Sequence, residues 1–377
     1  MSINRVVHLS KMTGAAGSEG HLLVLLDGLR RHGLDARLWI LVEADNPVQA
    51  YVDRAAALGI PTQRIVIRRD LDPGLGRRLV ESFREARPDV VHTHLLHADL
   101  YGIPAARRAG VPYVITSRHN DDRFRRALPM RWLNRWLWRQ TDAGIAISEA
   151  IRQFSIEVER AAPDRVHTVR YGLDPATVQA PPGARDALCA ALDLPPGALI
   201  AGSVCRLIEQ KGLSYALRGF APVAAQVPQA HYVIVGDGPL RGDLEAEARA
   251  LGLAGRVHFL GWREDARAVM AALDLLLAPS LWEGFGLVFL EAMALGVPVL
   301  AARVSAIPEV VIDSETGWLV PAHDSGAITA ALLNALRDPV ELRRRGAQGR
   351  QRLEAHFSPA QMVEQTLAVY RSLESGA

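Results

Sequence analysis

The sequence predicts an α/β protein with two doubly wound, Rossmann-like domains that face a central cleft. The chain has 377 residues, which suits two domains at roughly 100–200 residues each. Short apolar runs alternate with longer amphipathic stretches from end to end, a pattern typical of successive strand–helix units in a parallel sheet. Glycines and prolines break this alternation between residues 171 and 185, which indicates a domain boundary.

The first series of apolar runs predicts strands with helices in most of the gaps between them. One such helix carries Leu22, Leu25, Leu26 and Leu29 on a single face and ends before Gly33, which tolerates a left-handed exit. The strands of this series are expected at 6–9, 36–41, 65–67, 90–93, 113–116, 144–147 and 166–169.

The second series predicts a separate sheet followed by two helices at 341–356 and 359–373. No repeat of fixed period links the two halves. We therefore expect a first domain over 1–175, a second domain over 176–356 and a C-terminal helix within 357–377. The strands of the second series are expected at 199–204, 231–235, 256–260, 275–278, 298–301 and 318–320.

The composition excludes several classes of protein. Hydrophobic residues make up 49% and charged residues 22%, a globular profile that excludes a disordered or coiled-coil chain. A formal net charge of +2 is too even for a protein that binds nucleic acid. Cys189 and Cys205 are too few for a disulfide framework and favour a reducing cytoplasm. His8 interrupts the first apolar run, and no run reaches ~20 residues, so we expect neither a signal peptide nor a transmembrane helix.

Two glutamates after the strand at 275–278 mark the strongest candidate for a binding site. Inside one helix, Glu283 and Glu291 would lie about 80° apart and would not share a face. Two intervening glycines instead place Glu283 in a loop, so that a helix begins near Leu287 with Glu291 one turn inside it. The unpaired amides of that first turn form an anion site flanked by carboxylates, which suits a nucleotide sugar. The alternative is a helix whose acidic residues merely favour its positive end.

Two cations follow the strand at 199–204. Arg206 offers a planar fork of donors and Lys211 a compact positive charge, and both lie in a loop that opens a helix. Lys11 is the only other lysine of an arginine-rich chain, which draws attention to Lys211. The pair would hold a diphosphate; the alternative is that both are solvated surface charges. A loop at Gly236 can also line the cleft, whereas the P-loop pattern G-x-x-x-x-G-K-[ST] occurs nowhere in the chain.

These motifs resemble those of retaining glycosyltransferases of family 4, the group 1 glycosyltransferases, which have the two-domain GT-B fold. The segment from Glu283 to Glu291 resembles the E-x7-E motif of that family. Arg206 and Lys211 resemble its paired diphosphate-binding residues. The resemblance extends along nearly the whole chain.

The resemblance implies roles for individual residues. Glu283 would contact the transferred sugar and Glu291 the ribose. His119, just after the strand at 113–116, would approach the transferred sugar; the alternative is a loop histidine bonded to nearby backbone. The last helix would cross back to the first domain. The other implied donor contacts are the amides of Phe285, Gly286 and Leu287, the backbone near Trp262, and the glycine loops at Gly14, Gly17 and Gly236.

A histidine cluster lies around the strand at 90–93. His92 and His94 share one face of that strand, and His97 falls in the following turn. Zinc is conceivable, with Asp99 as the one apparent fourth ligand. We expect instead a polar lining of the acceptor side and no metal, because the implied reaction needs none.

Arginines and tryptophans interleave at 123–139, so a helix after Pro129 would be cationic on one side and aromatic on the other. Such a helix can lie on an anionic membrane surface and bring the enzyme to a lipid-linked acceptor. A buried tryptophan face with solvated arginines explains the pattern equally well. We therefore expect a cytoplasmic protein that can associate peripherally with the inner face of a membrane.

The sequence thus predicts a retaining, metal-independent hexosyltransferase that uses no cofactor. It would move a sugar from a nucleoside-diphosphate sugar to a hydroxyl of a glycan or lipid-linked acceptor, while Arg206, Lys211 and the amides near Leu287 stabilise the departing diphosphate. A sugar-nucleotide epimerase would isomerise the donor without an acceptor, and a non-catalytic glycan-binding subunit would bind without turnover. A dehydrogenase is disfavoured because no G-x-G-x-x-G follows a first strand in either half.

Overall fold

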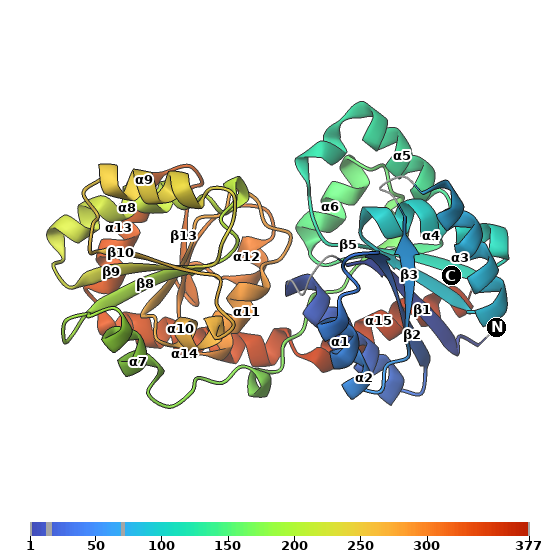
Figure 1. Cartoon of the computed structure of the whole chain (residues 1–377), viewed down its shortest axis with the longest axis horizontal. Coiled ribbons are helices and arrows are strands. Elements are labelled where there is room, and N and C mark those ends of the chain that lie inside the picture. The colour runs from blue at the N-terminus through green and yellow to red at the C-terminus, as the bar shows by residue number, and fades with distance from the viewer. Residues whose placement is uncertain (1, 13–16, 69–71, 376–377) are drawn as a thin grey trace. The chain divides into compact units, whose positions relative to one another are not determined.

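The chain forms two compact units, each with a parallel sheet between layers of helices (Figure 1). The computed structural model describes residues 2–12, 17–68 and 72–375. The first unit consists of Met1–Gly172 together with Pro359–Ala377, and the second of Leu173–Ser358. Every strand predicted from the sequence is present at nearly the predicted position.

The first unit contains a seven-stranded sheet within the described residues. Its strands are β1 (Arg5–Lys11), β2 (Asp35–Glu43), β3 (Thr62–Ile67), β4 (Val90–His94), β5 (Tyr113–Arg118), β6 (Ala143–Ala146) and β7 (Val166–Thr168). Its helices are α1 (Gly17–Arg31), α2 (Gln49–Ala57), α3 (Pro73–Ala86), α4 (Leu95–Ala109), α5 (Leu128–Trp138), α6 (Glu149–Glu157) and α15 (Pro359–Glu374), with short 3-10 turns η1 (Arg123–Arg126) and η2 (Pro163–Arg165).

The second unit contains a six-stranded sheet. Its strands are β8 (Leu199–Val204), β9 (Ala230–Val235), β10 (Val257–Gly261), β11 (Leu275–Ala278), β12 (Val299–Ala302) and β13 (Gly317–Val320). Its helices are α7 (Ala184–Ala191), α8 (Leu213–Gln226), α9 (Arg241–Ala250), α10 (Ala266–Ala271), α11 (Leu287–Ala294), α12 (Ile307–Val310), α13 (Ser325–Leu336) and α14 (Pro339–His356), with 3-10 turns η3 (Pro175–Thr177) and η4 (Glu209–Lys211).

The order of the strands reverses at one point in each sheet. The first sheet has the order β3-β2-β1-β4-β5-β6-β7 and the second the order β10-β9-β8-β11-β12-β13, with parallel neighbours throughout. At a reversal the connections leave to opposite faces of the sheet, which opens a crevice beyond the carboxyl ends of the two strands. The candidate sites therefore lie at the ends of β1 and β4 and at the ends of β8 and β11.

Apolar strands between two helical layers account for the core of each unit. Val7 and Leu9 of β1 and Leu275 and Leu277 of β11 are fully buried. Strands covered on both faces need continuous apolar runs, which is the pattern of the sequence. Because these strands are held rigidly, the loops at their carboxyl ends are held as well. None of the helices within the described residues is long and apolar enough to span a bilayer.

Helix α15, the last of the chain, packs within the first unit. Its buried face includes Val363, Leu367 and Tyr370. The helix approaches α1 so closely at Gly28 that a Cβ atom there would lie 2.3 Å from Cγ2 of Val363. Gly28 therefore permits the contact between α1 and α15.

We predict that Gly28→Ala lowers the free energy of unfolding by about 1–3 kcal/mol, because the stiff Val363 side chain cannot move away without shifting α15. Gly20→Ala, in the same helix, is the control, since a Cβ atom at Gly20 meets nothing within 4 Å. Urea unfolding of both variants, followed by circular dichroism, measures the difference. Equal stability of the two variants would show that the close approach at Gly28 is not a constraint.

Candidate active site

A pocket lies where the strand order of the second sheet reverses. It is formed by the ends of β8 and β11, by the loops that follow them and by the first turn of α11. Lys211 and Glu283 are the charged residues among those that line it, and Cys205, Ser280 and Val288 lie beside them. The pocket is built from residues of the second unit alone.

Lys211 and Glu283 form an ion pair in this pocket. The Nζ atom of Lys211 lies 2.5 Å from Oε2 of Glu283, and the two side chains are only 17% and 12% exposed. The sequence placed both residues at one anion site but did not predict that they bind each other. The ion pair brings together one predicted cation and one predicted carboxylate.

Hydrogen bonds between two loops hold this pair in place. The side-chain amide of Gln210 donates to the carbonyl of Trp282 over 3.0 Å, and the amide of Leu281 donates to the carbonyl of Gln210 over 2.7 Å. The neighbours of these residues are Lys211 and Glu283, so the loop after β8 is fixed to the loop after β11. Sequence reasoning missed Gln210, because only the fold brings it to the other loop.

Helix α11 begins where the glycines predicted. Gly286 is its N-cap, with a left-handed backbone at φ 83°, and Leu287 is its first residue. The Phe285 side chain is buried and makes an edge-on contact with Phe357, with ring centroids 5.8 Å apart. This packing fixes the start of α11, and Val288 of its first turn lines the pocket. Amides in the first turn of a helix have no acceptor within the helix, so they form a potential anion site beside Lys211.

A second loop is fixed by the close approach of Gly236 to β8. Its φ of 126° favours glycine, and a Cβ atom there would lie 1.9 Å from the carbonyl oxygen of Cys205. The Gly236 amide also donates to the carbonyl of Gly261 over 2.7 Å. Trp262 follows Gly261 and is 74% exposed. The loops of Gly236 and Trp262 are therefore neighbours, as a shared role in binding the donor would require.

Neither Arg206 nor Glu291 is among the residues that line the pocket. Arg206 is exposed, and its guanidinium makes no hydrogen bond or ion pair to any residue that the structure describes. Glu291 accepts hydrogen bonds at Oε1 from Nη2 and Nε of Arg267, over 2.8 and 3.0 Å. Sequence reasoning missed Arg267, because it lies in α10 and no local motif marks it.

Cys205 is a poor nucleophile despite its place in the pocket. Burial raises the pKa of its thiol to about 12, so the group is protonated at neutral pH. The thiolate that covalent catalysis would need is therefore absent near pH 7.

His119 lies at the carboxyl end of β5 in the first unit, and it is only 8% exposed. Both of its ring nitrogens are bonded: Nδ1 to the Tyr171 hydroxyl over 2.5 Å and Nε2 to His94 Nδ1 over 3.1 Å. Burial, followed by repulsion from His21, holds the pKa of His119 well below its ordinary value. The ring is therefore neutral at pH 7. Gly17 is the first residue of α1, whereas Gly14 lies outside the described residues.

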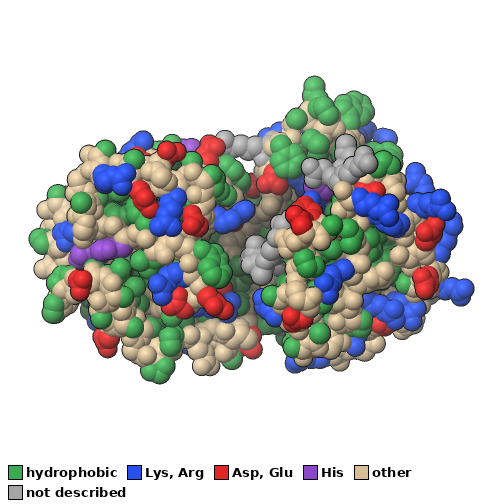
Figure 2. All heavy atoms as spheres, in the orientation of Figure 1, with side chains coloured by type: hydrophobic (Ala, Val, Ile, Leu, Met, Phe, Trp, Pro, Cys, Tyr) green, Lys and Arg blue, Asp and Glu red, His purple; other side chains and the backbone are tan. Residues whose placement is uncertain are grey.

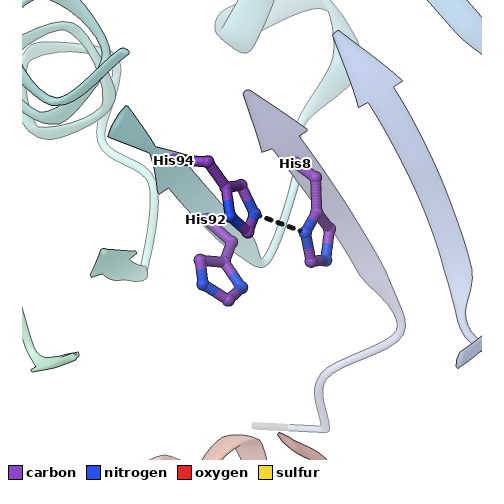
Figure 3. A group of neighbouring side chains, drawn as sticks. All are labelled: His8, His92 and His94. Atoms are coloured by element: carbon purple, nitrogen blue, oxygen red, sulfur yellow. Dashed lines mark hydrogen bonds between the residues drawn. The ribbon is translucent and has the colours of Figure 1, made fainter. Parts of the chain in front are cut away.

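The histidine cluster differs from the predicted one. His92 and His94 of β4 lie beside His8 of β1, with one nitrogen of each residue within 4.8 Å of the others (Figure 3). His8 is the register partner of His92, a signal that becomes available only once the strand pairing is known. His97 is outside this group. The suggestion that Asp99 completes a zinc site is wrong, because Asp99 is buried and bonded to Arg118 over 2.5 Å.

The segment 123–139 presents aromatic residues to solvent. Trp138 is turned inward, where its Nε1 donates to Glu159 over 2.8 Å. Trp132 and Trp136 are 68% and 45% exposed, and Leu128 is 66% exposed. Figure 2 shows hydrophobic side chains gathered over the region of α5. The alternative of a buried tryptophan face therefore fits Trp138 but is wrong for Trp132 and Trp136.

Comparisons with known proteins agree with the fold and the motifs. A family described as Glycosyltransferase Family 4 matches residues 15–177, and one described as Glycosyl transferases group 1 matches residues 197–338. The alpha-maltose-1-phosphate synthase of Mycolicibacterium smegmatis is 32% identical over 316 residues, which are 76% of this chain and 79% of that protein. The phosphatidyl-myo-inositol mannosyltransferase of Mycobacterium leprae is 29% identical and covers 95% of this chain and 93% of its own length.

Solved structures show the same architecture. HepE from Anabaena, in complex with UDP and glucose, has a TM-score of 0.86 at 21% identity and covers 98% of this chain and 100% of its own. This likeness confirms the GT-B fold. The family match and the named relatives favour neither an epimerase nor a non-catalytic subunit. The chain therefore belongs to the group 1, family 4 glycosyltransferases, the family that its E-x7-E segment resembles.

Proposed function

We propose that this glycosyltransferase binds the diphosphate of its nucleotide-sugar donor in the pocket where the second sheet reverses, and transfers the sugar with retention. The observation that carries the proposal is the convergence of Lys211, Glu283 and the first turn of α11 on one pocket. A cation and a ring of amides suit the diphosphate, and a carboxylate suits sugar hydroxyls.

The ion pair suggests how the donor enters. Glu283 neutralises Lys211 in the ion pair, so neither charge is left buried and unpaired. A diphosphate competes for Lys211 with more negative charge than one carboxylate. Glu283 would then accept hydrogen bonds from hydroxyls of the transferred sugar, while Lys211 and Arg206 bind the phosphates.

The same groups would stabilise the leaving group. When the bond between the anomeric carbon and the phosphate oxygen breaks, negative charge grows on the diphosphate. Lys211 and the first turn of α11 meet at the pocket. We propose that Arg206 and the amides of Phe285, Gly286 and Leu287 join Lys211 in stabilising that charge. We propose that the reaction therefore needs neither a divalent cation nor another cofactor.

Retention would follow from attack on the face that the diphosphate leaves. The acceptor oxygen forms a bond to the anomeric carbon, and its proton passes to a phosphate oxygen of the departing diphosphate. Among the residues that line the pocket, the protonated Cys205 does not supply a nucleophile for double displacement. We assign Glu283 to the hydroxyls of the transferred sugar and not to attack on its anomeric carbon.

We assign the remaining donor contacts to residues outside the pocket lining. Glu291, oriented by Arg267, would bind the ribose. The backbone near Trp262 and the Gly236 loop would bind the base and phosphates. The first unit would contribute His119, Gly14 and Gly17 toward the sugar and phosphates.

We predict that Lys211→Ala lowers kcat on the order of 10²-fold, because it removes positive charge where the leaving group becomes negative. Arg218→Ala is the matched control: it removes a cation from the second unit that pairs with Glu247 over 2.7 Å on the surface. Initial rates with the best-binding nucleotide sugar, measured with excess EDTA, test both variants. Wild-type turnover of Lys211→Ala would contradict the assignment, and loss of wild-type activity in EDTA would contradict metal independence.

We further propose a lipid-linked acceptor that is reached at an anionic membrane surface through α5. The exposed Trp132, Trp136 and Leu128 can enter the interface while Arg135 and Arg139 face anionic headgroups. Glu159 bonds Arg125 and Trp138 and so anchors the inner side of this segment. A relative named as a phosphatidyl-myo-inositol mannosyltransferase supports an acceptor of this class.

We predict that the protein floats with liposomes that contain anionic lipid, and that the triple variant Arg131→Gln, Arg135→Gln, Arg139→Gln does so several-fold less. The control variant Arg337→Gln, Arg343→Gln, Arg350→Gln loses the same charge from exposed positions of the second unit. Flotation in a density gradient measures the bound fraction. Equal binding of both triple variants would remove α5 as the membrane contact.

A further inference from the structure

A continuous chain of hydrogen bonds runs through the interior of the first unit. It begins at Ser117 and His92, passes through Tyr370 of α15 to His8, and continues through His94 to His119 and Tyr171. Each of these seven side chains is at most 8% exposed. The six successive bonds, from Ser117 to Tyr171, measure 2.8, 2.8, 3.2, 2.9, 3.1 and 2.5 Å.

This chain of hydrogen bonds uses both ring nitrogens of each of its four histidines, which are His8, His92, His94 and His119. A neutral imidazole carries one proton, so it donates through one nitrogen and accepts through the other. Burial is the largest cause that lowers the pKa of these histidines, to about 3 for His8. All four rings are therefore neutral at pH 7. Each hydrogen bond along the series can then hold one proton, supplied by one of its two partners.

Because the rings are neutral, the donor in one hydrogen bond determines the donor in the next. If His8 donates to His94, then His94 accepts at Nε2 and must donate at Nδ1 to His119. His119 then accepts at Nε2 and carries its own proton on Nδ1, toward Tyr171. If the first bond is reversed, every later bond is reversed as well. The tautomer of His119 is thus set at the other end of the chain.

Tyr370 is the residue that can determine which partner donates in the hydrogen bonds from His8 to His119. Its hydroxyl bridges His92 Nδ1 and His8 Nε2, so it joins the rings of β4 and β1 on the side away from His119. The hydroxyl can donate to only one of these nitrogens and accepts from the other, so the direction in which it points decides which nitrogen of His8 carries the proton. The other members of the chain come from the sheet and from Tyr171, whereas Tyr370 comes from the last helix.

A metal ion is the other use for such a cluster, because nitrogens of His8, His92 and His94 lie within 4.8 Å of one another (Figure 3). The rings of His8 and His94, however, point nitrogens at each other over 2.9 Å, as the dashed line in Figure 3 shows. An ion would have to break this bond and turn the rings. The hydrogen-bonded chain explains the positions of the rings as they stand.

We propose that Tyr370 is a positioning residue for His119: through His8 and His94 it fixes the tautomer and the orientation of the His119 ring. The inference rests on the proposed role of His119 toward the transferred sugar. Docking of α15 against the rest of the first unit would then be needed for an active His119. Tyr370 is buried and would act on His119 only through the histidines to which it is bonded.

The experiment compares Tyr370→Phe with Thr366→Val in the full chain. Thr366 lies one turn earlier in α15, is equally buried, and its hydroxyl donates to the carbonyl of Met362 over 2.8 Å, outside the histidine chain. Two-bond ¹H–¹⁵N correlation spectra of histidine-labelled protein report which nitrogen of His119 carries the proton, and His119→Ala assigns its signals. We expect the His119 pattern to change in Tyr370→Phe and to stay unchanged in Thr366→Val.

Turnover supplies the second readout. We expect kcat to fall about tenfold in Tyr370→Phe, a size typical when a group that orients a functional residue is lost, and to stay unchanged in Thr366→Val. His8→Gln should have the same effect. The double variant Tyr370→Phe, His8→Gln should be no slower than either single variant, because both substitutions interrupt the same series of hydrogen bonds.

The possible results separate this inference from the function on which it rests. An unchanged His119 pattern in Tyr370→Phe, or additive losses in the double variant, would overturn the positioning role. Binding of Zn²⁺ that shifts the signals of His8, His92 and His94 would overturn it too, since the nitrogens would then be ligands. If His119→Ala turns over at the wild-type rate, the proposed role of His119 is wrong, while the spectra still decide whether Tyr370 sets its tautomer.

Discussion

An ion pair between Lys211 and Glu283 lies where the strand order of the second sheet reverses, and the proposed donor site depends on it. The two side chains are only 17% and 12% exposed, so either charge alone would be costly to hold there. Each needs the other, or a ligand that replaces it. A diphosphate joined to a sugar supplies both replacements, since it offers anionic oxygens to Lys211 and hydroxyls to Glu283. The donor site that we propose is one in which the diphosphate binds Lys211 in place of Glu283.

The two units share a topology but place different chemistry at the reversal. The second unit has formal charges at the ends of β8 and β11. The first unit has neutral imidazoles along β1, β4 and β5, because burial depresses their pKa values. A charged site suits a diphosphate. The imidazoles of the first unit carry no charge and are bonded to one another and to hydroxyl groups. Fold alone does not account for this difference, which comes from the side chains at equivalent strand ends.

Local patterns predicted the features that depend on local structure. Apolar runs located the strands, and the glycines around Phe285 correctly placed Glu283 in a loop and the start of α11 at Leu287. Features that depend on strand pairing or on contacts between distant loops were missed. The bond between Lys211 and Glu283, the approach of Arg267 to Glu291 and the addition of His8 to the histidine cluster are of this kind. Each joins residues far apart in the sequence, whose distance in space only the folded sheet determines.

Calorimetric titration of a nucleoside diphosphate into the wild type and Glu283→Gln tests whether the diphosphate displaces Glu283 from Lys211. The ligand is whichever of UDP, GDP, ADP and dTDP raises the melting temperature most. This product has no sugar to bond Glu283, so the carboxylate only competes with it for Lys211. We expect binding to be about fivefold tighter in Glu283→Gln, or roughly 1 kcal/mol, because that competition is lost. Unchanged or weaker binding would show that the diphosphate does not take the place of Glu283 at Lys211.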